Sequence, residues 1–136
     1  VEERVLELLE EFEILPLIDS PIGRLSRGQT YKAALVALMA VNPDIWILDE
    51  PFASGMDPHG IASFRRHARE AVRKGHTVIY STQLLELAET FSDRVCIISE
   101  GRVHAFDEMS HLRGTSGASD GHILEELFER LREVPE

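Results

Sequence analysis

Residues 45–50 read Ile-Trp-Ile-Leu-Asp-Glu, and this run constrains the fold more than any other part of the chain. Its four consecutive apolar residues predict a strand that is apolar on both faces, which is what a buried parallel sheet requires. Two further short apolar runs follow at residues 77–80 and 95–98, and helical segments separate the three runs. The order strand–helix–strand–helix–strand predicts an α/β architecture of parallel strands with right-handed crossover helices.

Helix and turn signals flank these strands. Apolar side chains recur at helical spacing near the N-terminus, Ser26 fits an N-cap, and Pro58 suits a first helical turn. Glu100-Gly101 predicts a tight turn into a short strand over residues 102–106, which makes a terminal hairpin. The predicted helices span residues 1–12, 26–41, 58–74, 82–91 and 123–132, and residues 113–121 are predicted to form a flexible link.

Composition limits the class of protein. Of the 136 residues 43% are hydrophobic, which suffices for a packed core in one domain or a large piece of one. Lys and Arg number 14 and Asp and Glu number 24, so the formal net charge of −10 disfavours nucleic acid and anionic lipid as direct partners. The single cysteine, Cys96, lies in an apolar run, where we expect a buried and inert thiol. No apolar stretch is long enough to cross a bilayer.

Two motifs carry candidate chemistry. Residues 25–29 read Leu-Ser-Arg-Gly-Gln at a helix start, where free N–H groups and the helix dipole favour a phosphate, although Ser26 also fits an ordinary cap. Asp49 and Glu50 end a buried strand, where ligand sites in open α/β sheets lie. There Asp49 could hold Mg²⁺ through water, and Glu50 could accept a proton from an attacking water. Acidic residues are also common at solvated strand ends.

Two weaker motifs follow downstream. Residues 54–58 read Ser-Gly-Met-Asp-Pro, which also fits a turn and a helix start. Residues 81–83 read Ser-Thr-Gln at the end of the next apolar strand, which also fits a polar cap. Each motif has a simple structural explanation when it is considered alone, so the evidence for a function lies in the order of the motifs along the chain.

The ordered set of motifs resembles the ABC ATPase family. Residues 25–29 look like the signature motif of that family, with Arg27 in a place where glycine is common. Residues 45–49 look like its Walker B strand, Glu50 like its catalytic carboxylate, and residues 54–57 like its D-loop. Gln83 occupies the place of the switch histidine. The stretch from Asp93 to Val103 also fits, so the resemblance covers almost the whole chain.

The resemblance implies a mechanism in which two ATPase domains sandwich two ATP molecules head to tail. Asp49 would position Mg²⁺ through water, Glu50 would polarise the attacking water, and Gln83 would sense the γ-phosphate. Closing the sandwich would drive attached membrane subunits to switch. The residues expected to reach the ATP bound by the facing subunit, or to lie on the dimer seam, are Ser26, Arg27, Gly28, Gln29 and Asp57.

Three departures from the family pattern bear on activity. No glycine-rich loop ending in Gly-Lys-Ser or Gly-Lys-Thr occurs, so we expect the C-terminal part of a P-loop NTPase fold without its Walker A strand-loop-helix, inactive alone. The start at Val1 fits a fragment. Gln83 can donate a hydrogen bond but cannot carry the proton or charge of a histidine, which predicts slower hydrolysis. Residues 30–32, Thr-Tyr-Lys, replace basic residues of the family and are expected to matter less.

The expected organisation is one partial domain in three parts. Residues 1–42 would end the helical subdomain and supply the signature helix, residues 43–110 the core, and residues 111–136 a linker and a C-terminal helix. Residues 121–128 resemble the closing helix of exporter ATPases, so we expect an ATP-hydrolysing subunit of an ABC exporter, bound to a membrane permease at the cytoplasmic face. Two alternatives stay open: a soluble ABC ATPase that is not a transporter, and a truncated, non-catalytic interaction module. A chain lacking strands should also leave an apolar sheet edge or face uncovered.

Overall fold

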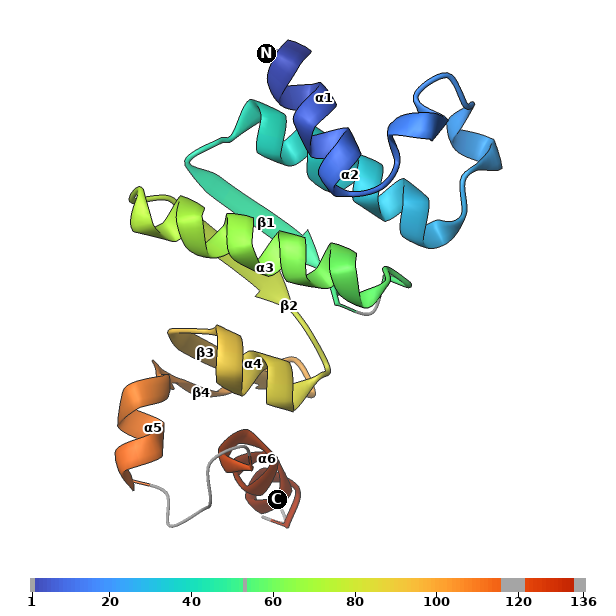
Figure 1. Cartoon of the computed structure of the whole chain (residues 1–136). Helices are drawn as coiled ribbons and strands as arrows, with labels where there is room; N and C mark the ends of the chain where they lie inside the picture. Colours follow the sequence, from blue (N-terminus) through green and yellow to red (C-terminus); the bar gives the residue numbers. More distant parts are fainter. Residues whose placement is uncertain (1, 53, 116–121, 134–136) are drawn as a thin grey trace. The chain divides into compact units, whose positions relative to one another are not determined.

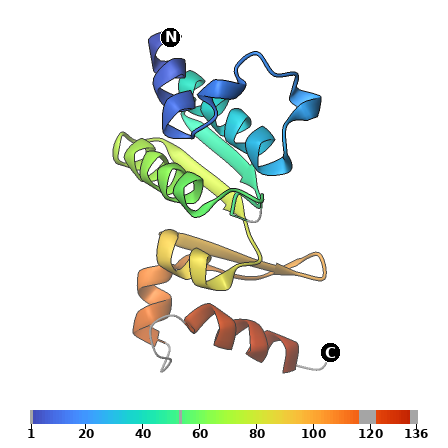
Figure 2. The ribbon, with the colours of Figure 1, turned by 45° about the vertical axis from the view of Figure 1, so that its right-hand side comes forward.

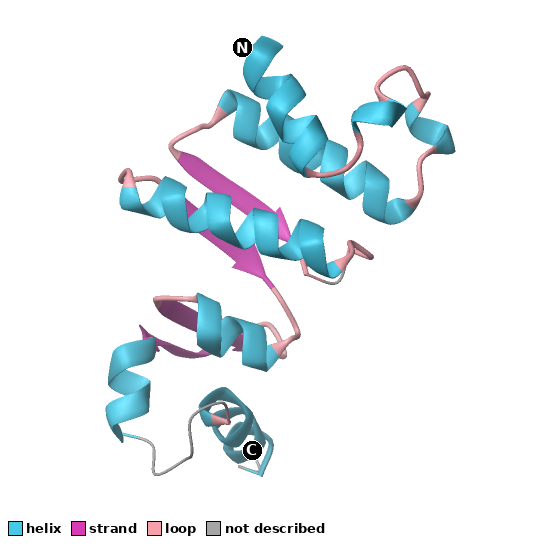
Figure 3. Ribbon diagram, in the orientation of Figure 1, coloured by secondary structure: helices cyan, strands magenta, loops and turns pink. Residues whose placement is uncertain are grey.

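The computed structural model describes residues 2–52, 54–115 and 122–133, and the chain forms two compact units, residues 1–82 and residues 83–136. Each unit combines helices with a two-stranded sheet (Figure 1, Figure 3). The first unit contains α1 (Glu2–Glu11), the 3-10 turns η1 (Leu15–Leu17) and η2 (Ile22–Arg24), α2 (Arg27–Val41), β1 (Ile45–Asp49), α3 (Pro58–Arg73) and β2 (Thr77–Ser81). The second unit contains α4 (Leu85–Phe91), β3 (Arg94–Ser99), β4 (Arg102–Glu108), α5 (Met109–Thr115) and α6 (Ile123–Glu133).

The first unit is built around a parallel pair of strands. β1 and β2 pair in register, with Ile45 opposite Thr77 and Asp49 opposite Ser81, and α3 is the crossover between them. Figures 1 and 2 show α3 lying along one face of this sheet. The predicted strand–helix–strand order is therefore confirmed, and it brings the carboxyl ends of both strands to the same edge.

One face of this sheet is covered and the other is open in the part of the chain that the structure describes. Trp46 and Leu48 are buried together with Phe64 of α3, whereas Ile45 and Ile47, which alternate with them, are 58% and 77% exposed. The prediction that residues 45–48 are buried on both faces is wrong for this chain, because the residues described supply helices to one face. The expectation of an uncovered apolar face is confirmed.

The ends of α2 and α3 follow the predicted signals. Ser26 caps α2, and Asn42 ends it in the left-handed conformation at φ 49°. Asp57 caps α3, and Gly75 follows that helix at φ 93°, a conformation that costs glycine least. The N-caps Ser26 and Asp57 fix where the two polar segments before α2 and α3 end. Helix α1 packs against α2.

In its described residues, the second unit is a hairpin with three helices. β3 and β4 pair antiparallel around the turn at Glu100-Gly101, as predicted, and a buried cluster that includes Met109 and Leu124 lies beneath them. α4 begins at Leu85, later than its predicted cap. α5 runs to Thr115, so the prediction of a link over residues 113–121 is wrong at its start; its remainder lies outside the described residues.

Cys96 is exposed, so the prediction of a buried thiol is wrong. Val95 and Ile97 on either side of it are buried in the core of the second unit. Side chains alternate along a strand, so Cys96 points to the opposite face of the hairpin. No helix in the described part of the chain combines the length and the apolar composition needed to cross a membrane.

Candidate functional site

The register of the parallel strands brings Asp49 and Ser81 together at their carboxyl ends. Ser81 Oγ donates a hydrogen bond to Asp49 Oδ1 at 2.5 Å and accepts one from the backbone N–H of Glu50 at 3.1 Å. The motif at residues 81–83 had predicted Gln83, but not Ser81, as a site residue. The available signal was the position of Ser81, at the end of the strand that pairs with β1.

Glu50 combines an unusual backbone conformation with an unmet hydrogen-bond acceptor. Its φ is 46°, in the left-handed region that residues other than glycine rarely adopt. Its carboxylate oxygen Oε2 is buried and has no hydrogen-bond partner among the described residues. A buried polar atom left unpaired costs about 1–3 kcal/mol. Such a group is placed for a ligand or a water rather than for stability.

Aromatic packing holds the chain that follows Glu50. The Phe52 ring lies 5.7 Å from the Phe64 ring of α3 and meets the Tyr80 ring of β2 edge-on at 5.3 Å between centroids. The buried hydroxyl of Ser54 donates to the Pro51 carbonyl at 3.0 Å. These contacts fix the turn that leaves β1, and with it the backbone that presents Glu50.

The start of α2 is a capping box. Ser26 Oγ accepts from the Gln29 backbone N–H at 3.2 Å, and Gln29 Oε1 accepts from the Ser26 backbone N–H at 2.9 Å. The ordinary capping role considered for Ser26 is thus confirmed. Ser26 and Arg27 are both exposed. Among the described residues the Ser26 hydroxyl accepts but does not donate, so its O–H can still donate to a ligand.

Gly28 packs against the segment of residues 54–57 in the same chain. A Cβ atom at position 28 would lie 2.4 Å from the carbonyl oxygen of Gly55, so a side chain cannot fit there. Gly55 itself has φ 83°. The absence of a side chain at Gly28 thus allows the backbone of Gly55 to approach the first turn of α2.

Two residues just inside α2 connect it to the predicted site. Lys32 is buried and forms an ion pair with Asp57, whose Oδ1 also accepts from the Gly60 backbone N–H at 2.8 Å. The hydrogen bond from Lys32, and after it the one from Gly60, hold the pKa of Asp57 below its ordinary value of 3.8. Tyr31 Oη donates to the Asp49 carbonyl at 3.3 Å, and burial, followed by the charge of Asp49, raises the pKa of Tyr31. Tyr31 and Lys32 thus connect α2 to the end of β1 and to the cap of α3.

The predicted site residues fall into three places. Asp49 and Glu50 end β1, the capping segment of α2 lies against the segment that ends at Asp57, and Gln83 is exposed ahead of α4 in the second unit. No group of three or more His, Cys, Asp or Glu side chains within residues 2–52, 54–115 and 122–133 is arranged to hold a metal ion. Asp49 with Ser81 suits Mg²⁺, which keeps most of its waters and often binds through one carboxylate and phosphate oxygens.

These features define the class of the first unit. It is a parallel α/β unit with two carboxylates at the end of β1. The capped N-terminus of α2 packs against the segment of residues 54–57. Ligand sites in such sheets lie at this edge, and helix N-termini favour anions. A site of this kind suits a phosphate-bearing ligand.

Comparison with known proteins identifies the family. The model of the ABC transporter family matches residues 1–53. A putative ABC transporter ATP-binding protein of Methanothermobacter marburgensis is 37% identical over 121 residues, which are 84% of this chain and 43% of that protein. The daunorubicin resistance ATP-binding protein DrrA2 of Streptomyces coeruleorubidus is 33% identical over 132 residues, 97% of this chain and 40% of DrrA2. A solved ATP binding subunit of an ABC transporter matches with a TM-score of 0.86 and 32% identity, over 97% of this chain and 54% of that one.

The chain belongs to the ABC transporter ATP-binding family and has the α/β fold of ABC ATPases. The resemblance inferred from the motifs is thus confirmed. The chain spans about half the length of the relatives and of the solved structure that it matches, or somewhat less.

Proposed function

We propose that this chain is part of an ATP-hydrolysing subunit of an ABC transporter, in which Glu50 polarises the attacking water. The main support for this role is the buried Glu50 Oε2, which has no hydrogen-bond partner among the described residues. A water placed beside it would satisfy this acceptor and would be polarised by it. The ATP-binding names of the relatives support the nucleotide.

Asp49 is proposed to position Mg²⁺ through a water. When bound, Mg²⁺ neutralises charge on the transferring phosphoryl group. The Ser81 hydroxyl holds Oδ1 of Asp49, so the carboxylate has a fixed orientation relative to the end of β1. The Glu50 backbone N–H is tied to the same hydroxyl. Ser81 would therefore orient both acids.

A second ATPase domain is proposed to complete the site. The exposed start of α2, with a hydroxyl, an Arg and the positive end of a helix dipole, supports contact with the ATP of that facing domain. Gln83 is proposed to sense the γ-phosphate. The residues proposed to face the second domain's ATP or the dimer seam are Ser26, Arg27, Gly28, Gln29 and Asp57.

The transporter context is proposed on broader grounds. The name of DrrA2 and the amphipathic α6 favour an exporter ATPase bound to a membrane permease at the cytoplasmic face. The three parts, residues 1–42, 43–110 and 111–136, are proposed as the signature-bearing end of the helical subdomain, the core, and the linker with its closing helix.

Replacing Glu50 by glutamine in the intact protein tests the mechanism. Loss of the proton-accepting group should lower ATP turnover by about 10²-fold or more, while Mg-ATP binding stays within about twofold. Glu13→Gln is the matched control, because Glu13 also has a positive φ (58°) but is exposed and outside the site. Wild-type turnover in Glu50→Gln would remove Glu50 from the mechanism.

A further inference from the structure

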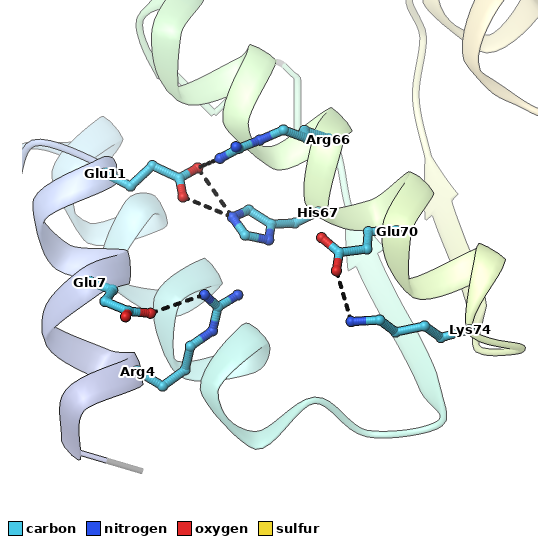
Figure 4. Close-up of polar contacts among 7 residues, drawn as sticks. All are labelled: Arg4, Glu7, Glu11, Arg66, His67, Glu70 and Lys74. Carbon is cyan, nitrogen blue, oxygen red and sulfur yellow. Dashed lines mark hydrogen bonds and ion pairs between the residues drawn. The ribbon is translucent and has the colours of Figure 1, made fainter.

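Glu11, the last residue of α1, contacts several residues of α3. His67 Nε2 donates to both carboxylate oxygens of Glu11, at 3.1 and 3.0 Å, and Arg66 pairs with Oε1 at 2.5 Å (Figure 4). The backbone carbonyl of Glu11 accepts from His59 Nε2 at 3.0 Å. We call Glu11, His59, Arg66 and His67 the α1–α3 clasp. The side chains of α3 thereby neutralise a carboxylate at a helix C-terminus, where the helix dipole disfavours it.

The clasp is partly shielded from water at its centre. His67 is 8% exposed, and the Phe12 ring stacks on it at 6.4 Å between centroids. The Glu11 side chain is 23% exposed, while Arg66 reaches it from the surface. Burial favours a higher pKa for Glu11, but the hydrogen bonds from His67 and Arg66 outweigh it and hold the pKa of Glu11 below its ordinary value.

A cavity of about 510 Å³ lies beside the clasp. Its lining comes from α1, α2, α3 and β1, and includes Arg4, Met39, Glu70, Lys74 and Trp46 as well as members of the clasp. Figure 4 shows these charged side chains around the gap between the two helices. The Arg4–Glu7 and Glu70–Lys74 ion pairs each stay within one helix. The hydrogen bonds and ion pair of the clasp, in contrast, join α1 to α3 beside this cavity.

The two clasped helices lead to two parts of the surface that is proposed to face the second domain. The chain leaving α1 at Glu11 passes through η1 and η2 to Ser26, and α3 begins at its cap Asp57. We propose that Glu11 is a positioning residue, whose carboxylate ties α1 to α3 and so holds the segment of residues 12–25 that leads into Ser26. The effect on turnover rests on the proposed function, whereas the effect on this segment does not.

Glu11→Gln in the intact protein removes the charge and keeps the shape. Amide hydrogen exchange in residues 12–25 should quicken about tenfold, because local opening loses a charged, partly buried contact. The kcat for ATP should fall about three- to tenfold with KM within about twofold, since Glu11 acts by position and does not touch nucleotide. Glu70→Gln is the matched control: it removes an ion pair beside the same cavity and should change each quantity by less than about twofold.

A double variant separates a specific clasp from general weakening. If Glu11 acts through His67, Glu11→Gln with His67→Gln should slow turnover no more than Glu11→Gln alone. Additive losses, or unchanged exchange in Glu11→Gln, would overturn the clasp. Faster exchange with unchanged kcat, in a protein that Glu50→Gln inactivates, would overturn the positioning role and leave the proposed function standing. Exchange is read without turnover, so it tests the clasp even in a protein that hydrolyses no ATP.

Discussion

Replacing Gly28 by alanine adds a methyl group where the structure has no space. The new Cβ would lie 2.4 Å from the Gly55 carbonyl oxygen, 3.0 Å from its carbonyl carbon and 3.4 Å from the Met56 nitrogen. Carbon–oxygen contacts settle at about 3.3–3.6 Å, so the methyl must displace its neighbour by about 1 Å. The obstacle is backbone, which cannot rotate aside as a flexible side chain could.

Two opposing effects set the size of the loss. Overpacking of this kind costs about 1–3 kcal/mol, whereas replacing glycine by alanine in a helix gains up to about 1 kcal/mol. The segment of residues 54–57 resists displacement, since Ser54 is bonded to the Pro51 carbonyl and Asp57 to Lys32. We therefore expect Gly28→Ala to lower the free energy of unfolding by about 1–2 kcal/mol, near the difference between these two effects.

Chemical denaturation of the intact protein measures this loss, with Gly23→Ala as the matched control. A Cβ at Gly23 would meet nothing within 4 Å. That variant should be neutral or gain about 0.4–1 kcal/mol by restricting the unfolded chain. The two substitutions are chemically identical and lie five residues apart, in η2 and in the first turn of α2, so only Gly28→Ala is expected to destabilise the protein. Gly28→Ala as stable as the wild type, or more stable than Gly23→Ala, would refute the contact.

Two further predictions concern the charged contacts. Lys32→Met should return the pKa of Asp57 toward 3.8, as measured by NMR titration. The free energy of unfolding should change by less than about 1 kcal/mol, because Asp57 is largely exposed and can rehydrate. An unchanged pKa of Asp57 would contradict the ion pair. The lowered pKa of Glu11 means that its contribution to stability is present above pH 4.5, the ordinary value, and is lost as the pH falls through the lower folded value. The stability difference between wild type and Glu11→Gln should therefore shrink below pH 4.5 in acid titrations, and a constant difference would count against the clasp.

Local patterns predicted those parts of the fold that depend on neighbours in the chain. Pro58 and the caps Ser26 and Asp57 marked helix starts, and Glu100-Gly101 marked the hairpin turn. The apolar run at residues 45–48 predicted a strand correctly. A run of four apolar residues before two acids is a local pattern, so a strand can be assigned from it without knowledge of distant contacts. Its burial was predicted wrongly, because burial depends on which elements cover each face.

Contacts between distant residues could not be predicted in the same way. The bond from Ser81 to Asp49 depends on strand register, and the Lys32–Asp57 pair depends on how α2 crosses toward α3. Neither leaves a periodic signal in the sequence. Cys96 was predicted wrongly for a related reason: a continuous apolar run does not reveal that one face of its strand stays exposed.

Two contacts of different kinds join α2 to the segment of residues 54–57, and together they make the two move as one rigid body. Gly28 against Gly55 is a steric contact between backbones, which resists approach, and Lys32 with Asp57 is an ion pair, which resists separation. Packed interiors transmit displacement because they have little room to yield. If a nucleotide held by a second domain docks at Ser26, as proposed, the resulting shift of α2 must be shared by Asp57 and by the α3 that it caps. The signature segment and the D-loop would then respond together within one chain.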